Sequence, residues 1–380
     1  MNGAGSENFL PPAGARVAVG MSGGVDSSMA AWLLKRRGCE VIGLTMSIWD
    51  GTIPLPGGGR SGCFGPGEEG RIAAARRMAE RLGIAHHIIR LAPEYRHEVI
   101  GYFRRAYLAG RTPNPCARCN REIKCRQLPE RARAEGLRFD FFATGHYVRR
   151  RDDPATGRCL LLQGRDASKD QSYFLALLDQ EQLRSLVLPL GDMRKSEVRA
   201  LARAAGFSEL ADGPESQDFV ESNDYGWLFE KGELRPGDMV DLAGRWVGRH
   251  QGLARYTIGQ RKGLGLGGAG EPWYVVALDA ERNRVVVGRR QDLVRRRMRV
   301  GALNWMALSA APATPMNILC RIRHRHSAAP GVLRLVSPEA SELEVVFNEP
   351  QTAITPGQIA VFYKGDTILG AGEIVSAGPD

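Results

Sequence analysis

The first 210 residues alternate short apolar runs with segments of helical periodicity, and this alternation limits the fold more than any other feature. Short apolar runs, each followed by a longer segment with apolar residues three or four apart, are typical of repeated β-α units. Such units form a parallel sheet with helices on both faces, and ligands bind at the carboxyl ends of its strands. We therefore expect an α/β domain. The expected strands are residues 16–20, 41–46, 85–91 and 139–144, and the expected helices are residues 27–37, 69–82 and 95–109.

Beyond Gly213 the pattern changes. Glycine and proline become frequent, helical periodicity fades, and from about Val300 one short apolar run follows another. Runs of this kind, separated by turn residues, are typical of a small barrel or sandwich. We expect a loose tail at residues 1–15, the α/β domain at 16–212, a small central β-rich linking domain at 213–294 and a C-terminal β-barrel at 295–380.

The charge of the chain favours a polyanionic partner. Lysine and arginine number 52 against 42 aspartates and glutamates, which gives a net charge of +10. An excess of this size is typical of nucleic-acid binding, although a merely basic enzyme has it too. Residues 281–300 carry eight arginines against two acids, a pattern that fits either RNA contact or a solvated hairpin face.

The cysteines and the amino terminus indicate the compartment. Residues 1–15 contain no lysine, arginine or apolar core, so we expect neither a signal nor a transit peptide. No run approaches the length of about 18 apolar residues that a membrane-spanning helix needs. We expect a cytoplasmic protein whose seven cysteines are thiols rather than a disulfide framework.

The stretch VAVGMSGGVDSS at residues 17–28 predicts a nucleotide-binding loop. A strand leads into glycines and then a helix, so the backbone can approach a phosphate closely and the helix amino terminus offers free N–H groups. Three serine hydroxyls add donors. No lysine follows the glycines, which excludes the G-x-x-x-x-G-K-[ST] loop of the common nucleoside triphosphatases.

A C-x-x-C pair, Cys116 and Cys119, stands in RTPNPCARCNREIK at residues 111–124. The two prolines before it predict an extended loop, because proline lacks an N–H and disfavours helix in the residue before it. A helix starting at Asn120 would place Cys119 near its amino terminus, where the pKa of a thiol is lowered. The spacing also occurs in zinc, redox and iron–sulfur sites, but no second C-x-x-C or H-x-x-x-H follows to close a zinc site.

These segments together carry a family resemblance. The loop resembles that of the N-type ATP pyrophosphatases, the PP-loop ATPases, which adenylate an oxygen and release pyrophosphate. Over residues 16–373 the chain resembles the tRNA-specific 2-thiouridylases, which place sulfur on C2 of the wobble uridine. The matching segments, in order, are SGGVDSS, GLTMSIW, GRTPNPCARCN, FATGHYVRR, KDQSYFL, HQGLARYTIGQRKGLG, EPWYVV and TPGQIAVFY.

The resemblance implies an adenine-nucleotide α-hydrolase-like domain, a linking domain and a β-barrel that binds the anticodon arm of tRNA. It implies Cys119 as the nucleophile, ATP as co-substrate, and Asp26 as a carboxylate that holds Mg²⁺ on the phosphates. The implied ATP contacts are Gly20, Met21, Ser22, Gly23, Gly24, Val25, Asp26, Ser27, Met46 and Gly145. The implied tRNA contacts are Asn114, Pro115, Cys116, His146, Lys169, Asp170, Gln171, Arg325, His326 and Gln358.

Departures from the family bear on the chemistry. The family usually has a second catalytic cysteine in a segment reading ESxxxCF, whereas residues 215–225 read ESQDFVESNDY and are about two residues short. Cys116 stands where the family often has Asp, and Cys63 is an additional cysteine. Two hypotheses follow. Cys63, Cys116 and Cys119 hold a 4Fe–4S cluster with one iron open to sulfide, with Cys125 as an alternative third ligand. Alternatively, Cys63 or Cys116 replaces the missing thiol in a persulfide relay.

Cys39, Cys159 and Cys320 lie in or beside apolar stretches and are expected to act as small hydrophobes. A monomer served by a sulfur-donor protein or sulfide is expected. Two rival functions stay open: a PP-loop ligase that modifies or amidates tRNA without sulfur transfer, and a tRNA-binding homologue without catalysis.

Overall fold

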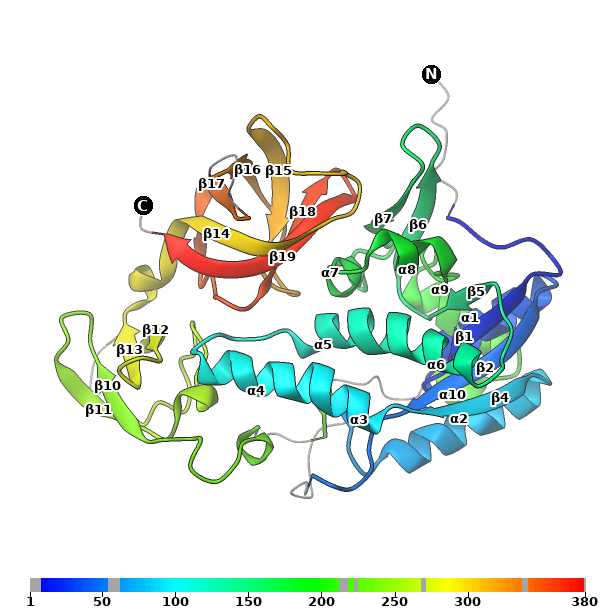
Figure 1. Cartoon of the computed structure of the whole chain (residues 1–380), viewed down its shortest axis with the longest axis horizontal. Helices are drawn as coiled ribbons and strands as arrows, with labels where there is room; N and C mark the ends of the chain where they lie inside the picture. The colour runs from blue at the N-terminus through cyan, green and yellow to red at the C-terminus, as the bar shows by residue number, and fades with distance from the viewer. Residues whose placement is uncertain are drawn as a thin grey trace. The chain divides into compact units, whose positions relative to one another are not determined.

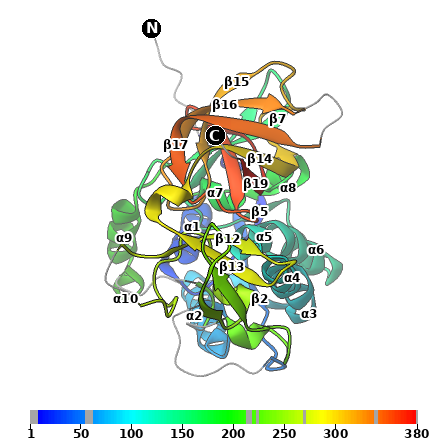
Figure 2. The ribbon, with the colours of Figure 1, turned by 90° about the vertical axis from the view of Figure 1, so that its left-hand side faces the viewer.

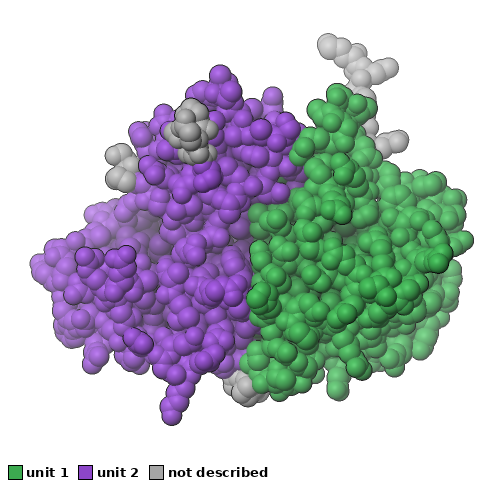
Figure 3. Space-filling model, viewed as in Figure 1, with its two compact units in different colours: residues 1–98, 116–223, 366–369 green, residues 99–115, 224–365, 370–380 purple. Residues whose placement is uncertain are grey.

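The computed structural model describes residues 8–53, 62–211, 218–221, 225–267, 271–336 and 341–378. Its internal contacts divide the chain into two units (Figure 3). Unit 1 consists of residues 1–98, 116–223 and 366–369, and unit 2 of residues 99–115, 224–365 and 370–380. The β-rich middle of the chain and the barrel thus fall in one unit, and the finer boundaries at 212/213 and 294/295 stay predictions.

Unit 1 contains a parallel five-stranded sheet in the order β4-β2-β1-β5-β8 (Figure 1). The central pair runs in register from Arg16 opposite Glu40 to Gly20 opposite Leu44. All pairings in this sheet are parallel, which confirms the predicted α/β fold. Its strands are β1 (Arg16–Gly20), β2 (Glu40–Ser47), β4 (Ala85–Arg90), β5 (Phe141–Ala143) and β8 (Leu186–Val187).

Helices cover both faces of this sheet. Val17 and Val19 of β1 belong to one apolar core with α1, α2 and α9, because alternate residues of a strand point to the same face. The helix α6 packs on β2 and β4, next to η2, and α3 packs on η2. The helices are α1 (Val25–Arg36), α2 (Glu68–Leu82), α3 (Ala92–Tyr95), η1 (Arg96–Ile100), α5 (Pro115–Arg118), η2 (Cys119–Gln127), α6 (Leu128–Ala134), α7 (Ser172–Leu175), α8 (Gln180–Ser185), α9 (Lys195–Ala204) and α10 (Ser208–Ala211).

Two smaller strand pairs complete unit 1, and neither was expected from the sequence. They are the antiparallel hairpin of β6 (Val148–Asp153) with β7 (Arg158–Gln163), and the parallel pair of β3 (Gly62–Phe64) with β9 (Asp218–Val220). The hairpin also joins β19 (Thr367–Gly378), because Leu162 of β7 pairs with Thr367.

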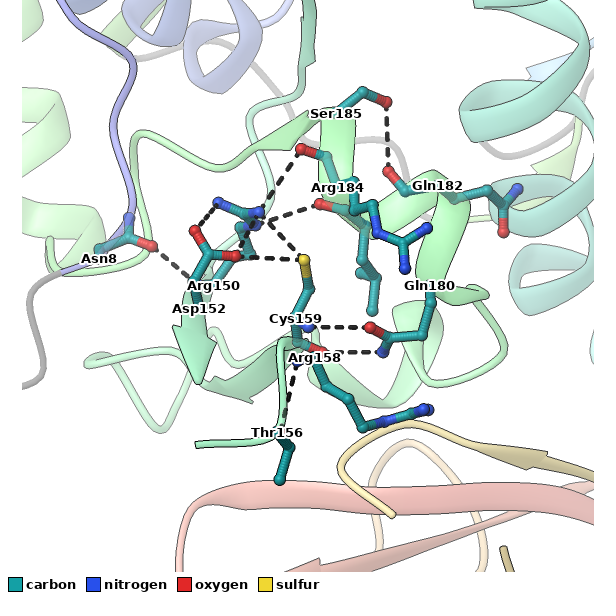
Figure 4. Close-up of polar contacts among 11 residues, drawn as sticks. Asn8, Arg150, Asp152, Thr156, Arg158, Cys159, Gln180, Gln182, Arg184 and Ser185 are labelled. Atoms are coloured by element: carbon teal, nitrogen blue, oxygen red, sulfur yellow. Dashed lines mark hydrogen bonds and ion pairs between the residues drawn. The ribbon is translucent and has the colours of Figure 1, made fainter. Parts of the chain in front are cut away.

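The hairpin is fixed by a buried arginine, Arg150, which is 3% exposed (Figure 4). Its guanidinium donates to the carbonyl of Leu183, to the carboxylate of Asp152 and to Sγ of Cys159 at 3.1 Å. The Cys159 thiol in turn donates to Asp152 at 3.2 Å, and burial raises its pKa. Cys159 is therefore a hydrogen-bonded thiol, whereas the sequence predicted a plain hydrophobe.

Unit 2 contains a four-stranded sheet and a barrel (Figure 2). The small sheet has the order β11-β10-β13-β12. The barrel strands pair in the order β14-β17-β16-β15-β18-β19, and the additional pairing of β14 with β19 closes the ring. The predicted barrel is thereby confirmed. The elements are α4 (Gly101–Leu108), η3 (Gly226–Leu228), β10 (Gly237–Val240), β11 (Trp246–His250), η4 (Leu253–Arg255), β12 (Tyr274–Asp279), β13 (Arg284–Gly288), η5 (Arg290–Leu293), β14 (Val294–Trp305), β15 (Met316–Arg321), β16 (Ala329–Leu335), β17 (Leu343–Thr352), β18 (Ile359–Lys364) and β19 (Thr367–Gly378).

Within the described ranges, no helix is both long enough and apolar enough to cross a membrane.

Candidate active site

The predicted nucleotide loop joins β1 to α1 at the carboxyl edge of the sheet. Gly23 has a φ of +80°, and a Cβ there would lie 2.7 Å from the carbonyl oxygen of Arg71, so only glycine fits. The Ser22 N–H donates to Oγ of Ser27 at 3.1 Å, which ties the loop to the first turn of α1. Gly24 precedes α1 without a side-chain cap, so the N–H groups of the first turn are available to an anion.

Gly145 packs against this loop from the end of β5. A Cβ at residue 145 would lie 2.6 Å from the carbonyl carbon of Asp26 and 2.7 Å from the nitrogen of Ser27. The structure thus brings Gly145 to the loop, as the predicted site requires. Met46 lies partly buried on the neighbouring strand β2, opposite Ile89.

Sequence reasoning missed two partners of Asp26. Nζ of Lys195 donates to both carboxylate oxygens, at 2.8 and 2.7 Å, and the Tyr147 hydroxyl donates to Oδ1 at 2.7 Å. Lys195 is 5% exposed and is the first residue of α9. A cation is disfavoured at a helix amino terminus, so a lysine there, in RKSEVR, was the available signal of a special role.

This ion pair bears on the predicted magnesium site. A carboxylate has about four acceptor positions, and three of those on Asp26 are already occupied by Lys195 and Tyr147. The Lys195 ammonium also neutralises the charge that a divalent cation would need. As arranged, Asp26 fits Mg²⁺ poorly.

The C-x-x-C segment is helical earlier than the sequence predicts. The helix begins at Pro115, which suits a first helical position, and η2 continues from Cys119 without a break. Cys119 is therefore a full turn inside a helix rather than at its amino terminus. Burial raises its pKa to about 12, opposed by the nearby Lys124 charge. The predicted lowering of this pKa is wrong, because desolvation of the thiolate outweighs the helix and lysine charges.

Cys63, Cys116 and Cys125 differ in burial and in their electrostatic effect on Cys119. Cys63 raises the pKa of Cys119, and Cys119 raises the pKa of Cys125, so Cys119 interacts with both of the other thiols. Cys125 is buried, and burial raises its pKa to about 12. Cys63 and Cys116 are partly exposed, on β3 and α5. Across the described parts of the chain, no three His, Cys, Asp or Glu side chains are gathered as metal ligands. As arranged in the described residues, the predicted cysteine ligands do not fit a cluster.

His146 directly follows Gly145 in the chain and is affected by the same lysine charge as Cys119. Its Nδ1 is 2.7 Å from Oγ1 of Thr144. Burial, with the charge of Lys124 as a second cause, holds its pKa well below the ordinary value, so the ring is neutral at physiological pH. Lys124 thus acts on both His146 and Cys119, a role that sequence reasoning missed.

Two predicted tRNA contacts of unit 1 make internal hydrogen bonds. The Asp170 carboxylate accepts from Gly164 N and from the N–H and hydroxyl of Ser172. Oε1 of Gln171 accepts from Tyr147 N at 2.9 Å. Lys169, which precedes Asp170 in the chain, is partly exposed. RNA contact by these residues stays a prediction.

The other predicted tRNA contacts lie in unit 2. Nε2 of Gln358 donates to the carbonyls of Thr112 and Pro113 at 3.1 and 3.0 Å, and so holds the loop that contains the buried Asn114 and leads to Pro115. Arg325 is exposed, and Nε2 of His326 is 2.9 Å from Oε1 of Gln351.

Comparison with known proteins adds the family. Three family models match successive parts of the chain: the tRNA methyl transferase HUP domain at residues 15–221, the tRNA methyl transferase PRC-barrel domain at 227–289 and the Aminomethyltransferase beta-barrel domain at 295–374. The tRNA-specific 2-thiouridylase of Moorella thermoacetica is 46% identical over 368 residues, which cover 94% of this chain and 99% of the relative. That of Roseiflexus sp. is 44% identical over 95% of this chain and 99% of the relative.

The first two model descriptions speak of methyl transfer, whereas these relatives are named for thiolation. Because these relatives are 44–46% identical over nearly the whole length, the chain belongs to the family of tRNA-specific 2-thiouridylases.

Proposed function

We propose that this protein catalyses the ATP-dependent 2-thiolation of the wobble uridine of tRNA. The observation that carries the proposal is the link between the loop and the thiol. Gly145 packs on the nucleotide loop, and the Lys124 charge acts both on the adjacent His146 and on Cys119. The groups proposed for ATP and for sulfur all belong to unit 1, and the Lys124 charge acts on residues of both.

The loop suits activation of the uridine. Its C2 oxygen is a poor leaving group until it attacks the α-phosphate of ATP, which releases pyrophosphate and leaves an adenylated oxygen. The free N–H groups at the start of α1 would stabilise the charge that grows on the phosphates. Lys195, held beside the loop by Asp26, would add a positive charge there. Mg²⁺, when bound with ATP, would supply further charge neutralisation.

Sulfur then displaces AMP at C2. Cys119 is the nucleophile that we propose, carrying the sulfur as a persulfide. Lys124 would stabilise the anionic form of a sulfur group on Cys119, because its charge already lowers the pKa of this thiol. A neutral His146 nearby can donate or accept one hydrogen bond without adding charge.

We propose that arginines of unit 2 bind tRNA through its backbone phosphates. The barrel strand β14 carries Arg295, Arg296, Arg297 and Arg299, and Arg325 is exposed in the same unit. Arginines of this kind would contact the anticodon arm through its backbone, and a single-stranded wobble base can be turned out into a pocket. We propose that the protein works as a monomer in the cytoplasm, where its seven free cysteines would stay reduced.

Mass spectrometry of tRNA tests the function. A strain deleted for its own 2-thiouridylase should regain wobble 2-thiouridine when it expresses this chain, but not when it expresses Cys119→Ser. Cys39→Ala is the matched control, since Cys39 lies in the α1–α2–α9 core. ATP–pyrophosphate exchange with tRNA but no 2-thiouridine would indicate a ligase instead, and no ATP turnover at all would indicate a binding protein.

A further inference from the structure

The loop that carries Cys63 is shaped to receive residues 218–221. In the β3–β9 pair, Gly62 lies opposite Asp218 and Phe64 opposite Val220, so Cys63 falls between the paired positions. A Cβ at residue 62 would lie 2.3 Å from the carbonyl carbon of Val220, so no other residue allows the two strands to approach this closely. The contact is therefore a built feature of the fold.

Glu221 locks this contact. Its N–H donates to the Phe64 carbonyl at 3.0 Å, and its carboxylate accepts from Gly67 N and forms an ion pair with Arg71. Arg71 also donates to the carbonyl of Cys63 at 2.7 Å. A Cβ at Gly67 would lie 2.6 Å from Oε1 of Glu221, so a glycine makes room for the carboxylate. The backbone of Cys63 is thus held in place from both sides.

Packing connects this segment to Cys119. The Phe64 ring stacks on Tyr95 with centroids 5.2 Å apart, and α3, which ends at Tyr95, packs against η2, which begins at Cys119. The charge of Cys63 reaches the Cys119 thiol and raises its pKa. Cys119 is 9% exposed, whereas Cys63 is partly open to solvent. A buried thiol and a partly exposed thiol, carried by two segments of unit 1, therefore interact electrostatically.

The position of the second cysteine in the family pattern suggests a role for Cys63. In ESxxxCF the cysteine is the sixth residue, and Val220 occupies that place here, fully buried and paired with Phe64. The chain thus carries a thiol on the adjacent strand, next to the residue that pairs with Val220.

We propose that Cys63 is the resolving thiol of the sulfur transfer and forms a transient disulfide with Cys119. The inference rests on the proposed function and names a further catalytic residue for it.

The steps balance with two co-reactants. A persulfide donor, R–S–SH, transfers its outer sulfur to Cys119 and leaves as R–SH. The Cys119 persulfide displaces AMP and forms Cys119–S–S–C2 with the uridine. The Cys63 thiolate attacks Sγ of Cys119, which breaks that S–S bond, releases 2-thiouridine and leaves a Cys63–Cys119 disulfide. An external dithiol then reduces the disulfide with two electrons and two protons. It can reach Cys63 from solvent because Cys63 is partly exposed.

The experiment is a single turnover with the full chain, tRNA, ATP and a persulfide donor, without reductant, followed by non-reducing gels and peptide mass spectrometry. The wild type should yield a Cys63–Cys119 disulfide and free 2-thiouridine. Cys63→Ser should still release AMP, which reports an intact fold, but should accumulate a covalent tRNA adduct at Cys119. Dithiothreitol should free thiolated tRNA from that adduct. Cys39→Ala should behave as the wild type.

Three results would overturn the inference while leaving the proposed function standing. They are wild-type turnover by Cys63→Ser, a disulfide that joins Cys116 to Cys119 instead, and activity that requires iron and acid-labile sulfide in anaerobically prepared protein. Failure of the wild type to form any 2-thiouridine would instead refute the proposed function, and the inference with it.

Discussion

The reactivity of Cys119 in the free enzyme gives the sharpest test of the site. Burial raises the pKa of this thiol from the ordinary 9.0 to about 12. At pH 8 such a shift lowers the thiolate fraction about a thousandfold. A more basic thiolate is intrinsically the better nucleophile, and a Brønsted coefficient of about 0.4–0.5 recovers about 15- to 30-fold of that loss. Cys119 should therefore be alkylated about 30- to 60-fold more slowly than an ordinary thiol.

Alkylation of the full chain by iodoacetamide, with each cysteine quantified by peptide mass spectrometry, measures this rate. The partly exposed Cys63 and Cys116 and the urea-unfolded chain are the references. Because the pKa of Cys119 is raised, its rate should keep increasing about tenfold per pH unit above pH 9, where an ordinary thiol levels off. Lys124→Met should slow Cys119 further, since that charge lowers its pKa. A midpoint near pH 8, or alkylation as fast as in the unfolded chain, would refute the reasoning.

Three further predictions concern the loop and the RNA. Gly145→Ala should abolish ATP–pyrophosphate exchange and cost about 1–3 kcal/mol in urea unfolding, because the new Cβ meets the backbone of the loop; its control, Gly70→Ala, meets nothing within 4 Å and should gain up to about 1 kcal/mol in the exposed helix. Asp26→Asn should destabilise the fold by about 3 kcal/mol in the same assay, since it leaves the buried Lys195 ammonium without a counter-charge; an unchanged midpoint would contradict this. Affinity for tRNA should fall steeply with salt, and Arg325→Ala should reduce the slope of log K against log salt by about 0.7–0.9 in filter binding if it contacts one phosphate; an unchanged slope would remove Arg325 from the interface.

Sequence reasoning was strongest where local pattern decides structure. Strand β1 matches its predicted bounds, and α1 and α2 agree within two residues, because apolar periodicity and glycine stops are local signals. It was weakest at Pro115, where proline was taken to prevent a helix that it in fact begins. It also missed the short pair β3–β9, since strands of three residues carry no periodicity and their pairing joins segments far apart in the chain.

By itself, the sequence determined the parallel sheet, the phosphate-binding loop, the family and the absence of a cysteine from ESQDFV, because each is written in neighbouring residues. Tertiary structure alone decided the chemical state of those residues. Asp26 is paired with Lys195 from 169 residues away, Cys119 is buried and its pKa raised, and Cys63 lies beside Val220. Charge pairing and desolvation depend on what surrounds a side chain in space, and only the folded chain specifies those surroundings.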